Sequence, residues 1–247
     1  MFNFFIDDLS SNTDAYTITG ADFNHLKNVL RMKVGEELLL SDGTSTHLCK
    51  IETFFEDFAT CKVIERNYLD TSLPLDIHLF QGLPKSDKLE LIIQKAVELG
   101  ATEITPVEMS RSIVKIEEKK KEQKTARWQA IAESAAKQSK RNLIPKVNCP
   151  VTYKNALNVA KDLDVLLIPY ESKNGMEDTK SALRLLKRGS KVGIIIGPEG
   201  GFEQKEIEDG ISVGGKVISL GKRILRTETA AITAVAMVML HAEMNIE

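Results

Sequence analysis

From about residue 75 onward, short apolar segments alternate with amphipathic ones, and this alternation constrains the fold more than any other feature. The apolar segments lie at about 75–83, 101–109, 164–170, 191–197 and 216–220. Strands that are apolar throughout are buried on both faces, which is typical of a parallel sheet covered by helices. The sequence therefore predicts an α/β domain with a parallel sheet over residues 74–247.

Helical patterns occupy the intervals between these strands. In the first interval, apolar residues recur at helical spacing from Leu89 to Leu99, and Gly100 follows as a helix stop. Helices are expected at about 86–99, 119–139, 153–161, 179–188 and 203–211, and from Glu228 onward. The last helix is apolar nearly all round, so it is either buried within its own domain or shared with a partner. We prefer the second interpretation, a homodimer interface.

The first 70 residues have a different character. Short runs with partial alternation of apolar and polar residues are separated by turn formers such as the Ser-Asp-Gly at 41–43. One helix is expected at about 21–30. Several short strands in so little chain predict a small β-barrel domain over residues 1–70. The polar segment 69–74, which contains a proline, is the expected linker.

Charge is distributed unevenly along the chain. Residues 1–70 carry 6 Lys or Arg and 12 Asp or Glu, whereas residues 110–146 carry 11 basic and 4 acidic residues. The basic segment is either a solvated helix face or a surface for a polyanion such as RNA, whose phosphates these side chains neutralise. The candidate RNA contacts are Lys85, Arg111, Lys115, Arg127, Lys137 and Arg141.

Several classes of protein are disfavoured. The N-terminal residues lack the basic start and apolar run of a signal peptide, and the longest nearly apolar run, 230–240, is too short to cross a bilayer. The three cysteines are widely spaced, and His47 and Cys49 lack the second pair of ligands that a zinc site needs. We therefore expect a cytoplasmic protein with free thiols, no bound metal and no association with a membrane.

Three loops that follow expected strands form the candidate ligand site, because parallel sheets bind ligands beyond the carboxyl ends of their strands. The first loop comprises residues 168–171 (IPYE), the second 197–201 (GPEGG) and the third 220–226 (LGKRILR). The second loop matches neither a phosphate-binding loop nor a dinucleotide fingerprint. Its glycines either bring the backbone close to a small or flat ligand or form a tight turn without a ligand.

The third loop places two arginines, Arg223 and Arg226, among apolar residues. Such a loop either holds an uncharged ring beside an anion or is an ordinary loop with its arginines in solvent. Thr227 is expected to cap the last helix, and Glu228 in the first turn suits the helix dipole.

Five segments, in this order, closely resemble the RsmE family of 16S ribosomal RNA (uracil-N3)-methyltransferases, which belongs to the SPOUT superfamily. They are QGLPKSDKLELIIQKAVELGATEITPV (81–107), SRSIVK (110–115), RWQAIAESAAKQSKR (127–141), IGPEGGF (196–202) and LGKRILRTETAA (220–231). The match covers about residues 75–240, and the N-terminal part resembles the family's PUA-like β-barrel. The resemblance implies a C-terminal trefoil knot and a homodimer. It also implies transfer of a methyl group from S-adenosylmethionine to N3 of a uridine in 16S rRNA of the small ribosomal subunit.

The resemblance assigns the three loops to the cofactor. The implied contacts are Ile168, Pro169, Tyr170, Ile196, Gly197, Pro198, Gly200, Gly201, Leu220, Gly221, Arg223, Ile224, Leu225 and Thr229. The reaction also needs a group that stabilises the uracil anion or anchors a phosphate, for which Arg226 is the candidate, and a base, for which Glu171 and Glu228 are candidates. Because N3 lies on the Watson–Crick edge, the target uridine must be unpaired or flipped out.

Three positions depart from the family pattern. Ser86 and Lys140 stand where glycine is usual, and Lys222 stands where proline is usual. The first two are expected to alter a turn slightly and the third to loosen its loop.

Other functions stay open on the sequence alone. A related enzyme of the same superfamily could methylate a ribose 2′-hydroxyl or transfer RNA, and a non-catalytic RNA-binding protein could use the same scaffold. A nucleotide-binding regulator is disfavoured, because the GPEGG loop lacks the Lys-Ser/Thr of a phosphate loop.

Overall fold

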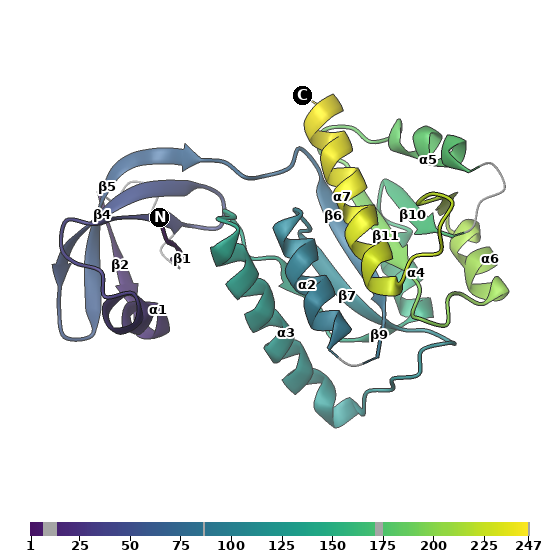
Figure 1. Ribbon diagram of the computed structural model, residues 1–247, viewed down its shortest axis with the longest axis horizontal. Helices are drawn as coiled ribbons and strands as arrows, with labels where there is room; N and C mark the ends of the chain where they lie inside the picture. The colour runs from purple at the N-terminus through teal and green to yellow at the C-terminus, as the bar shows by residue number, and fades with distance from the viewer. Residues whose placement is uncertain (7–13, 86, 171–174, 247) are drawn as a thin grey trace. The chain divides into compact units, whose positions relative to one another are not determined.

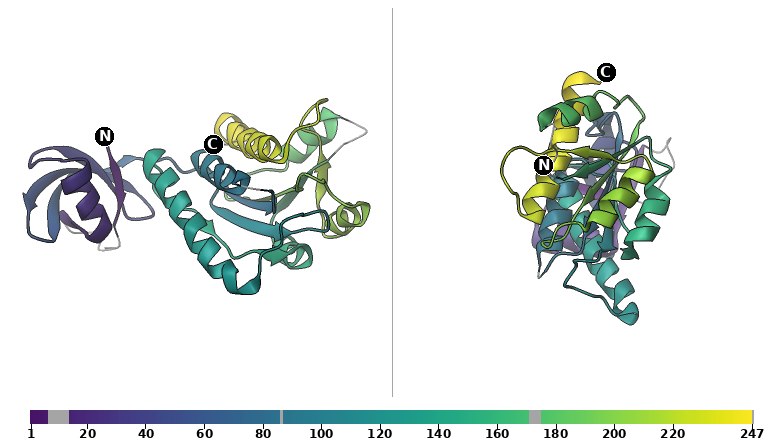
Figure 2. Two further views of the ribbon diagram at one scale, coloured as in Figure 1. Left: turned by 60° about the horizontal axis from the view of Figure 1, so that its bottom comes forward. Right: turned by 90° about the vertical axis from the view of Figure 1, so that its right-hand side faces the viewer.

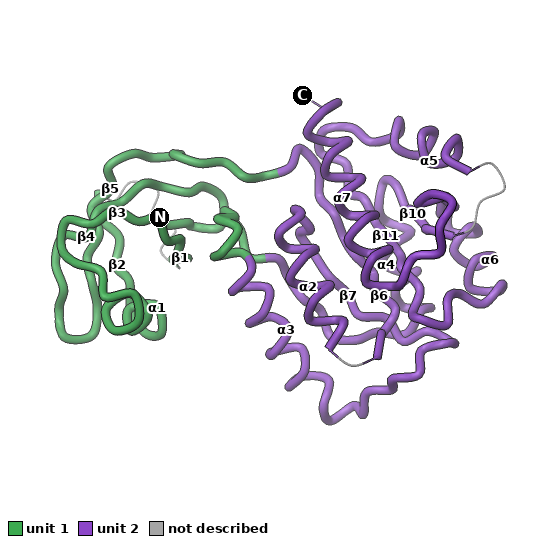
Figure 3. The backbone as a smooth tube through the Cα atoms, viewed as in Figure 1, with its two compact units in different colours: residues 1–72, 136–144 green, residues 73–135, 145–247 purple. Residues whose placement is uncertain are grey.

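The computed structural model describes residues 1–6, 14–85, 87–170 and 175–246, and the chain divides into two compact units (Figures 1 and 3). Unit 1 comprises Met1–Ser72 with Ala136–Ile144, and unit 2 comprises Leu73–Ala135 with Pro145–Glu247. The division falls within the helix α3 (Glu118–Gln138), whose last three residues are counted with unit 1. Unit 1 is therefore discontinuous in sequence.

Unit 1 is built on a five-stranded sheet. Its strands are β1 (Asn3–Phe5), β2 (Ala15–Thr19), β3 (Glu37–Ser41), β4 (Thr46–Phe54) and β5 (Phe58–Leu69), in the order β1-β3-β4-β5-β2. All neighbours are antiparallel except β1 and β3. Register shifts between β4 and β5 bend the sheet, which curls around an apolar core (Figure 2). The predicted small β-rich domain is confirmed.

The helix expected at 21–30 divides into two parts. A short α-helix, α1 (Gly20–Asn24), continues directly into a π-helical turn, η1 (His25–Val29). Phe23 and Leu26 are the buried residues of these two turns, and they belong to the core of unit 1.

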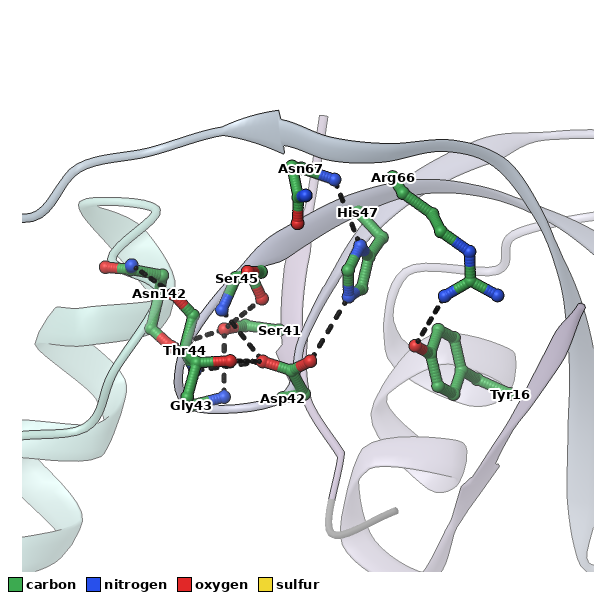
Figure 4. A network of polar contacts seen from close by, with 10 residues as sticks. All are labelled: Tyr16, Ser41, Asp42, Gly43, Thr44, Ser45, His47, Arg66, Asn67 and Asn142. Carbon is green, nitrogen blue, oxygen red and sulfur yellow. Dashed lines mark hydrogen bonds and ion pairs between the residues drawn. The ribbon is translucent and has the colours of Figure 1, made fainter. Parts of the chain in front are cut away.

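Asn142 joins the late segment of unit 1 to its sheet (Figure 4). Its side chain donates to the carbonyl of Thr44 at 2.9 Å and to the hydroxyl of Ser72 at 2.8 Å. Its own carbonyl accepts a hydrogen bond from the hydroxyl of Ser41. Since Asn142 is 1% exposed, these bonds are buried, and losing one of them leaves a polar group unpaired at a cost of about 1–3 kcal/mol.

His47 and Cys49 have separate roles in unit 1. Nε2 of His47 lies 3.3 Å from a carboxylate oxygen of Asp42, and its Nδ1 accepts from the amide of Asn67 at 3.2 Å (Figure 4). Cys49 and Cys61 are free thiols in the core, and burial raises the pKa of each to about 12. The prediction of free thiols is confirmed.

Lys140 has a backbone φ of +58°, in the left-handed region that favours glycine. This conformation costs an L-residue roughly 1–2 kcal/mol, and glycine adopts it without strain. We expect Lys140→Gly to raise the free energy of unfolding by about 0.5–1 kcal/mol, because the greater freedom of glycine in the unfolded chain offsets part of the gain. Urea unfolding measures this. Lys140→Ala retains a Cβ, so its free energy of unfolding should not rise. An equal rise in both variants would mean that the effect comes from loss of the lysine charge.

Unit 2 contains a sheet in which every pair of neighbouring strands is parallel, as predicted. Its strands are β6 (Asp76–Gly82), β7 (Glu103–Glu108), β8 (Lys146–Val147), β9 (Val151–Thr152), β10 (Val165–Pro169), β11 (Lys191–Ile196) and β12 (Lys216–Ile218). Their order is β12-β10-β11-β6-β7-β8, and β9 also pairs with β7. The two-residue strands β8 and β9 were not predicted.

Helices cover both faces of this sheet (Figure 2). On one face, α2 (Lys88–Glu98) packs against α7 (Thr227–Asn245), and α7 also contacts β6 and β11. On the other face, α4 (Tyr153–Ala160) and α6 (Gln204–Ser212) enclose a core with Phe80 and Ile168. α5 (Met176–Leu183) lies against β12 and ends earlier than the expected 188. Among the described residues, no helix combines the length and apolar content needed to cross a bilayer.

His78 in β6 is a buried titratable residue of unit 2. Its ring stacks on Phe80 with 3.9 Å between centroids, and Nε2 lies 2.7 Å from the hydroxyl of Thr105. Burial lowers the pKa of His78 from 6.5 to about 4, although the nearby carboxylate of Glu103 works in the opposite direction.

The unfolded chain therefore takes up a proton below pH 6.5 that the folded chain takes up only near pH 4. We expect the free energy of unfolding contributed by His78 to fall by about 3 kcal/mol between these pH values, and to be fully present above them. Urea unfolding at a series of pH values measures the slope. His78→Gln removes this titration and should flatten it; an unchanged slope would contradict the assignment to His78.

Candidate functional site

The carboxyl ends of three neighbouring strands meet at one edge of the parallel sheet. β10 pairs in parallel with both β11 and β12, so the loops that follow these strands emerge side by side. They are the three loops predicted from the sequence to bind a ligand. The strands begin as far apart in the sequence as Val165 and Lys216, so only the strand order brings the loops together.

The first loop presents an aromatic side chain to solvent. Ile168 is buried, Pro169 is half-buried, and Tyr170 is 40% exposed. The amide of Tyr170 donates to the carbonyl of Ile218 at the end of β12 (2.9 Å), and its ring meets Phe202 edge-on at 6.2 Å. Tyr170 therefore links the first loop to the other two. Glu171, a candidate base, lies outside the described residues.

The second loop is held by close backbone contacts. The amide of Gly201, whose φ is +69°, donates to the carbonyl of Pro198 at 2.9 Å. Arg111 donates from Nη1 to the carbonyl of Gly200 at 3.2 Å. A Cβ on Gly200 would lie 2.8 Å from that of Arg111, so glycine is required for this approach.

The third loop is the most exposed part of the site. Arg223, Ile224 and Arg226 are all exposed, and Ile224 has a relative exposure of 102%. Leu220, Gly221 and Leu225 are half-buried. Burying so exposed an isoleucine against a ligand or a second chain would be favourable, because it removes apolar surface from water.

α5 anchors the beginning of the third loop. The hydroxyl of Thr179 donates to the carbonyl of Ser219 at 2.8 Å and accepts from the amide of the same residue at 3.0 Å. Thr179 and Ser219 are both buried. The hydroxyl of Ser219 accepts in turn from the amide of Gly221 at 3.1 Å. The loop thus leaves β12 in a fixed direction.

Thr227 does not cap α7, so this prediction is wrong. Arg226 occupies the N-cap position, and the hydroxyl of Thr227 donates to the carbonyl of Gly197 at 2.7 Å. That hydroxyl also accepts from Nε2 of Gln81 at 2.9 Å. A tertiary contact to the second loop has replaced the local cap. Thr229, an implied cofactor contact, is exposed on the first turn of α7.

An ion-pair network lies at the same edge of the sheet. Nζ of Lys88 is 3.1 Å from Glu199 in the second loop and 3.2 Å from Glu228 at the start of α7. The amide of Lys85 donates to Glu199 at 3.1 Å. The hydrogen bond that the Lys88 ammonium donates to Glu199 is the main cause of the raised pKa of Lys88. Glu228, a candidate base, is therefore engaged by a cation.

The candidate RNA contacts differ in their exposure. Lys85, Arg111, Lys115 and Arg127 are exposed in unit 2, although Arg127 also pairs with Glu90 at 2.8 Å.

The two candidates in unit 1 are less accessible. Lys137 is paired with Asp22 at 2.6 Å. Arg141 is 3% exposed, and burial lowers the pKa of its guanidinium to about 10. A side chain buried to this extent does not reach an RNA phosphate, so the predicted contact at Arg141 is corrected: the residue belongs to the interior of unit 1.

Sequence reasoning did not single out Gln81, Thr179 or Ser219. Gln81 left a usable signal, because it is a polar residue near the end of a strand that is mostly apolar in sequence. Thr179 and Ser219 left none, since their contact joins residues 40 positions apart.

The unit with the parallel sheet and its three loops and the small β-rich unit are the two parts of an RNA methyltransferase with a PUA domain. Residues 71–239 match the RNA methyltransferase domain family and residues 18–65 match the RNA methyltransferase PUA domain. The chain belongs to the ribosomal RNA small subunit methyltransferase E family, RsmE.

Individual relatives cover nearly the whole chain. Ribosomal RNA small subunit methyltransferase E of Bacillus subtilis (strain 168) is 38% identical over 93% of this chain and 91% of its own. The solved structure of the Neisseria gonorrhoeae enzyme, bound to S-adenosylmethionine, is 30% identical over 97% of each chain, with a TM-score of 0.83. A methyltransferase of Legionella pneumophila with bound cofactor is 31% identical over 97% of each chain, with a TM-score of 0.78.

Proposed function

We propose that this chain transfers a methyl group from S-adenosylmethionine to N3 of a uridine in 16S rRNA of the small ribosomal subunit. One observation carries the proposal: three loops from adjacent parallel strands converge at one edge in a member of the RsmE family. A relative with the same fold holds the cofactor.

The loops suit a ligand with a flat ring and a short polar tail. A Cβ on Gly201 or Gly221 would meet no atom within 4 Å, so open space adjoins the backbone of the second and third loops. Tyr170 and Ile224 present exposed apolar surface at the same edge. Adenosine would lie against these apolar groups, with loop amides and carbonyls available to its polar atoms. The cofactor residues implied by the family resemblance are retained in this proposal.

The cofactor supplies an electrophilic methyl group, and the protein must align the acceptor and exclude water. Uracil N3 becomes nucleophilic only when it loses its proton. Arg226 stands exposed at the N-cap of α7, where its guanidinium can stabilise the developing uracil anion. Lys88 occupies an oxygen of Glu228, which makes that carboxylate less available as a base. Arg226 therefore has the leading role in this mechanism, and Glu171 and Glu228 remain the candidate bases.

The binding of RNA and of a second copy completes the proposal. Lys85, Arg111, Lys115 and Arg127 would contact phosphates, with unit 1 as a PUA-like barrel that grips neighbouring RNA. The C-terminal region would form the trefoil knot of the SPOUT superfamily. Beyond its buried face, α7 exposes apolar residues such as Leu240 (47%) and Met244 (72%), which supports a homodimer. The enzyme would act in the cytoplasm, without a metal.

Methylation of small subunits from cells that lack this activity tests the function directly. The modified nucleotide is identified by mass spectrometry, and primer extension distinguishes the site because N3 methylation blocks base pairing and 2′-O methylation does not. A 2′-O product or a methylated transfer RNA would replace the proposed substrate. A chain that binds no S-adenosylmethionine would favour a non-catalytic RNA-binding protein.

A further inference from the structure

Gln81 is a buried polar residue at the end of β6, and its side chain reaches the start of α7. The residue is 0% exposed, and its Nε2 donates to the hydroxyl of Thr227 and to the carbonyl of Gly82, both at 2.9 Å. The hydroxyl of Thr227, also buried, donates to the carbonyl of Gly197 at 2.7 Å. One chain of hydrogen bonds therefore joins three segments that are far apart in the sequence.

The direction of each bond is fixed by chemistry. The carbonyls of Gly82 and Gly197 can only accept, so Gln81 must turn its amino group toward Gly82 and Thr227 must give its single proton to Gly197. The hydroxyl of Thr227 then accepts the second amide proton of Gln81. Oε1 of Gln81 is buried and has no hydrogen-bond partner among the described residues. Because both ends of the chain are anchored on backbone carbonyls, a rearrangement would leave a further buried polar group unpaired.

The position of this chain connects it to the candidate site. Gly197 begins the second loop, and Thr227 directly follows Arg226 at the end of the third loop. The same hydrogen bonds therefore fix the backbone at the start of one loop and the end of another. β11, which leads into the second loop, pairs with β6 along its whole length, up to Ile196 opposite Gln81.

We propose that Gln81 and Thr227 are positioning residues that hold the second and third loops in the conformation that binds S-adenosylmethionine. This inference rests on the proposed function. The two residues would act indirectly, through the backbone of Gly197 and Arg226. Packing alone would be preserved by a valine of the same shape at position 227, so the role depends on the threonine hydroxyl.

Thr227→Val tests the hydroxyl. We expect the dissociation constant of S-adenosylmethionine, measured by titration calorimetry on the full chain, to rise about tenfold. Thr227→Ser restores the hydroxyl and should bind within about twofold of the wild type. Gln81→Met should also weaken binding. The double variant should lose less than the product of the two single effects, because the two residues act as one chain.

Thr102 offers a control away from the loops: it directly precedes β7, is half-buried, and its hydroxyl donates to the carbonyl of Ile77 near the start of β6 at 3.1 Å. Thr102→Val also removes a hydroxyl that donates to a backbone carbonyl, so it should lower the melting temperature while leaving cofactor affinity unchanged. Wild-type affinity in Thr227→Val, or an equal loss of affinity in Thr102→Val, would overturn the inference. A wild-type chain that binds no cofactor would overturn the proposed function as well, so the two failures are distinguishable.

Discussion

Replacing Arg226 with alanine is expected to slow methyl transfer by about a hundredfold to a thousandfold and to leave the affinity for S-adenosylmethionine nearly unchanged. The reason is its place at the N-cap of α7, where Thr227 fixes the backbone and the exposed guanidinium faces solvent at the edge of the site. In the proposed mechanism, removing the cation leaves the developing charge on uracil without a partner. Single-turnover methylation of small subunits gives the rate, and calorimetry gives the affinity.

Two further variants test whether a slower rate in Arg226→Ala comes from loss of this particular guanidinium. Lys222→Ala removes another exposed cation from the same loop and should retain full activity. Arg226→Lys keeps the charge but lacks the planar pair of donors, so an intermediate rate is expected. Full activity in Arg226→Ala would remove this residue from the mechanism. Equal losses in Arg226→Ala and Lys222→Ala would show that the loop contributes only general positive charge.

Gly82→Ala is expected to destabilise the protein by about 2–3 kcal/mol and to weaken cofactor binding by about a hundredfold. A Cβ at this position would lie 2.7 Å from the backbone nitrogen of Pro198 and 2.8 Å from the sulfur of Met109. The backbone of the second loop cannot yield as a flexible side chain would, so the loop itself must shift. Urea unfolding and calorimetric titration measure the two effects.

Gly193→Ala is the matched control, because it introduces similar crowding within β11. There the new Cβ would meet the ends of two side chains, Leu163 at 2.7 Å and Leu166 at 2.9 Å. These leucines can rotate, so we expect a smaller loss of about 1 kcal/mol and normal cofactor affinity. Normal affinity in Gly82→Ala would mean that the second loop does not bind the cofactor.

The architecture was predictable where a pattern is repeated along the chain. The apolar strands from β6 to β12 indicate burial on both faces, and this alone implies a parallel sheet with ligand loops at one edge. The two-residue strands β8 and β9 are too short to leave such a pattern. The order of the strands was not predictable either, because it depends on contacts between segments distant in sequence.

Individual side chains of the site were less predictable, since local preference and tertiary contact compete. Threonine is a favoured N-cap residue, but the hydroxyl of Thr227 instead donates to the carbonyl of Gly197, 30 residues away in the sequence. Arg141 belongs to the most basic part of the sequence, yet a count of charges does not reveal that its side chain is buried. Lys88 stands at the start of an amphipathic helix, and nothing in its local sequence shows that it joins Glu199 to Glu228.

The discontinuity of unit 1 has a consequence for how the protein is made. The first 72 residues leave the ribosome without residues 136–144, so the buried partners that Asn142 supplies to Ser41 and Thr44 arrive only after the whole of α3 has been synthesised. Unit 1 therefore stays incomplete while the first strands of unit 2, β6 and β7, are synthesised. A fragment that ends after β5 would lack residues 136–144 permanently. A stable N-terminal fragment would therefore need this segment added as a separate peptide.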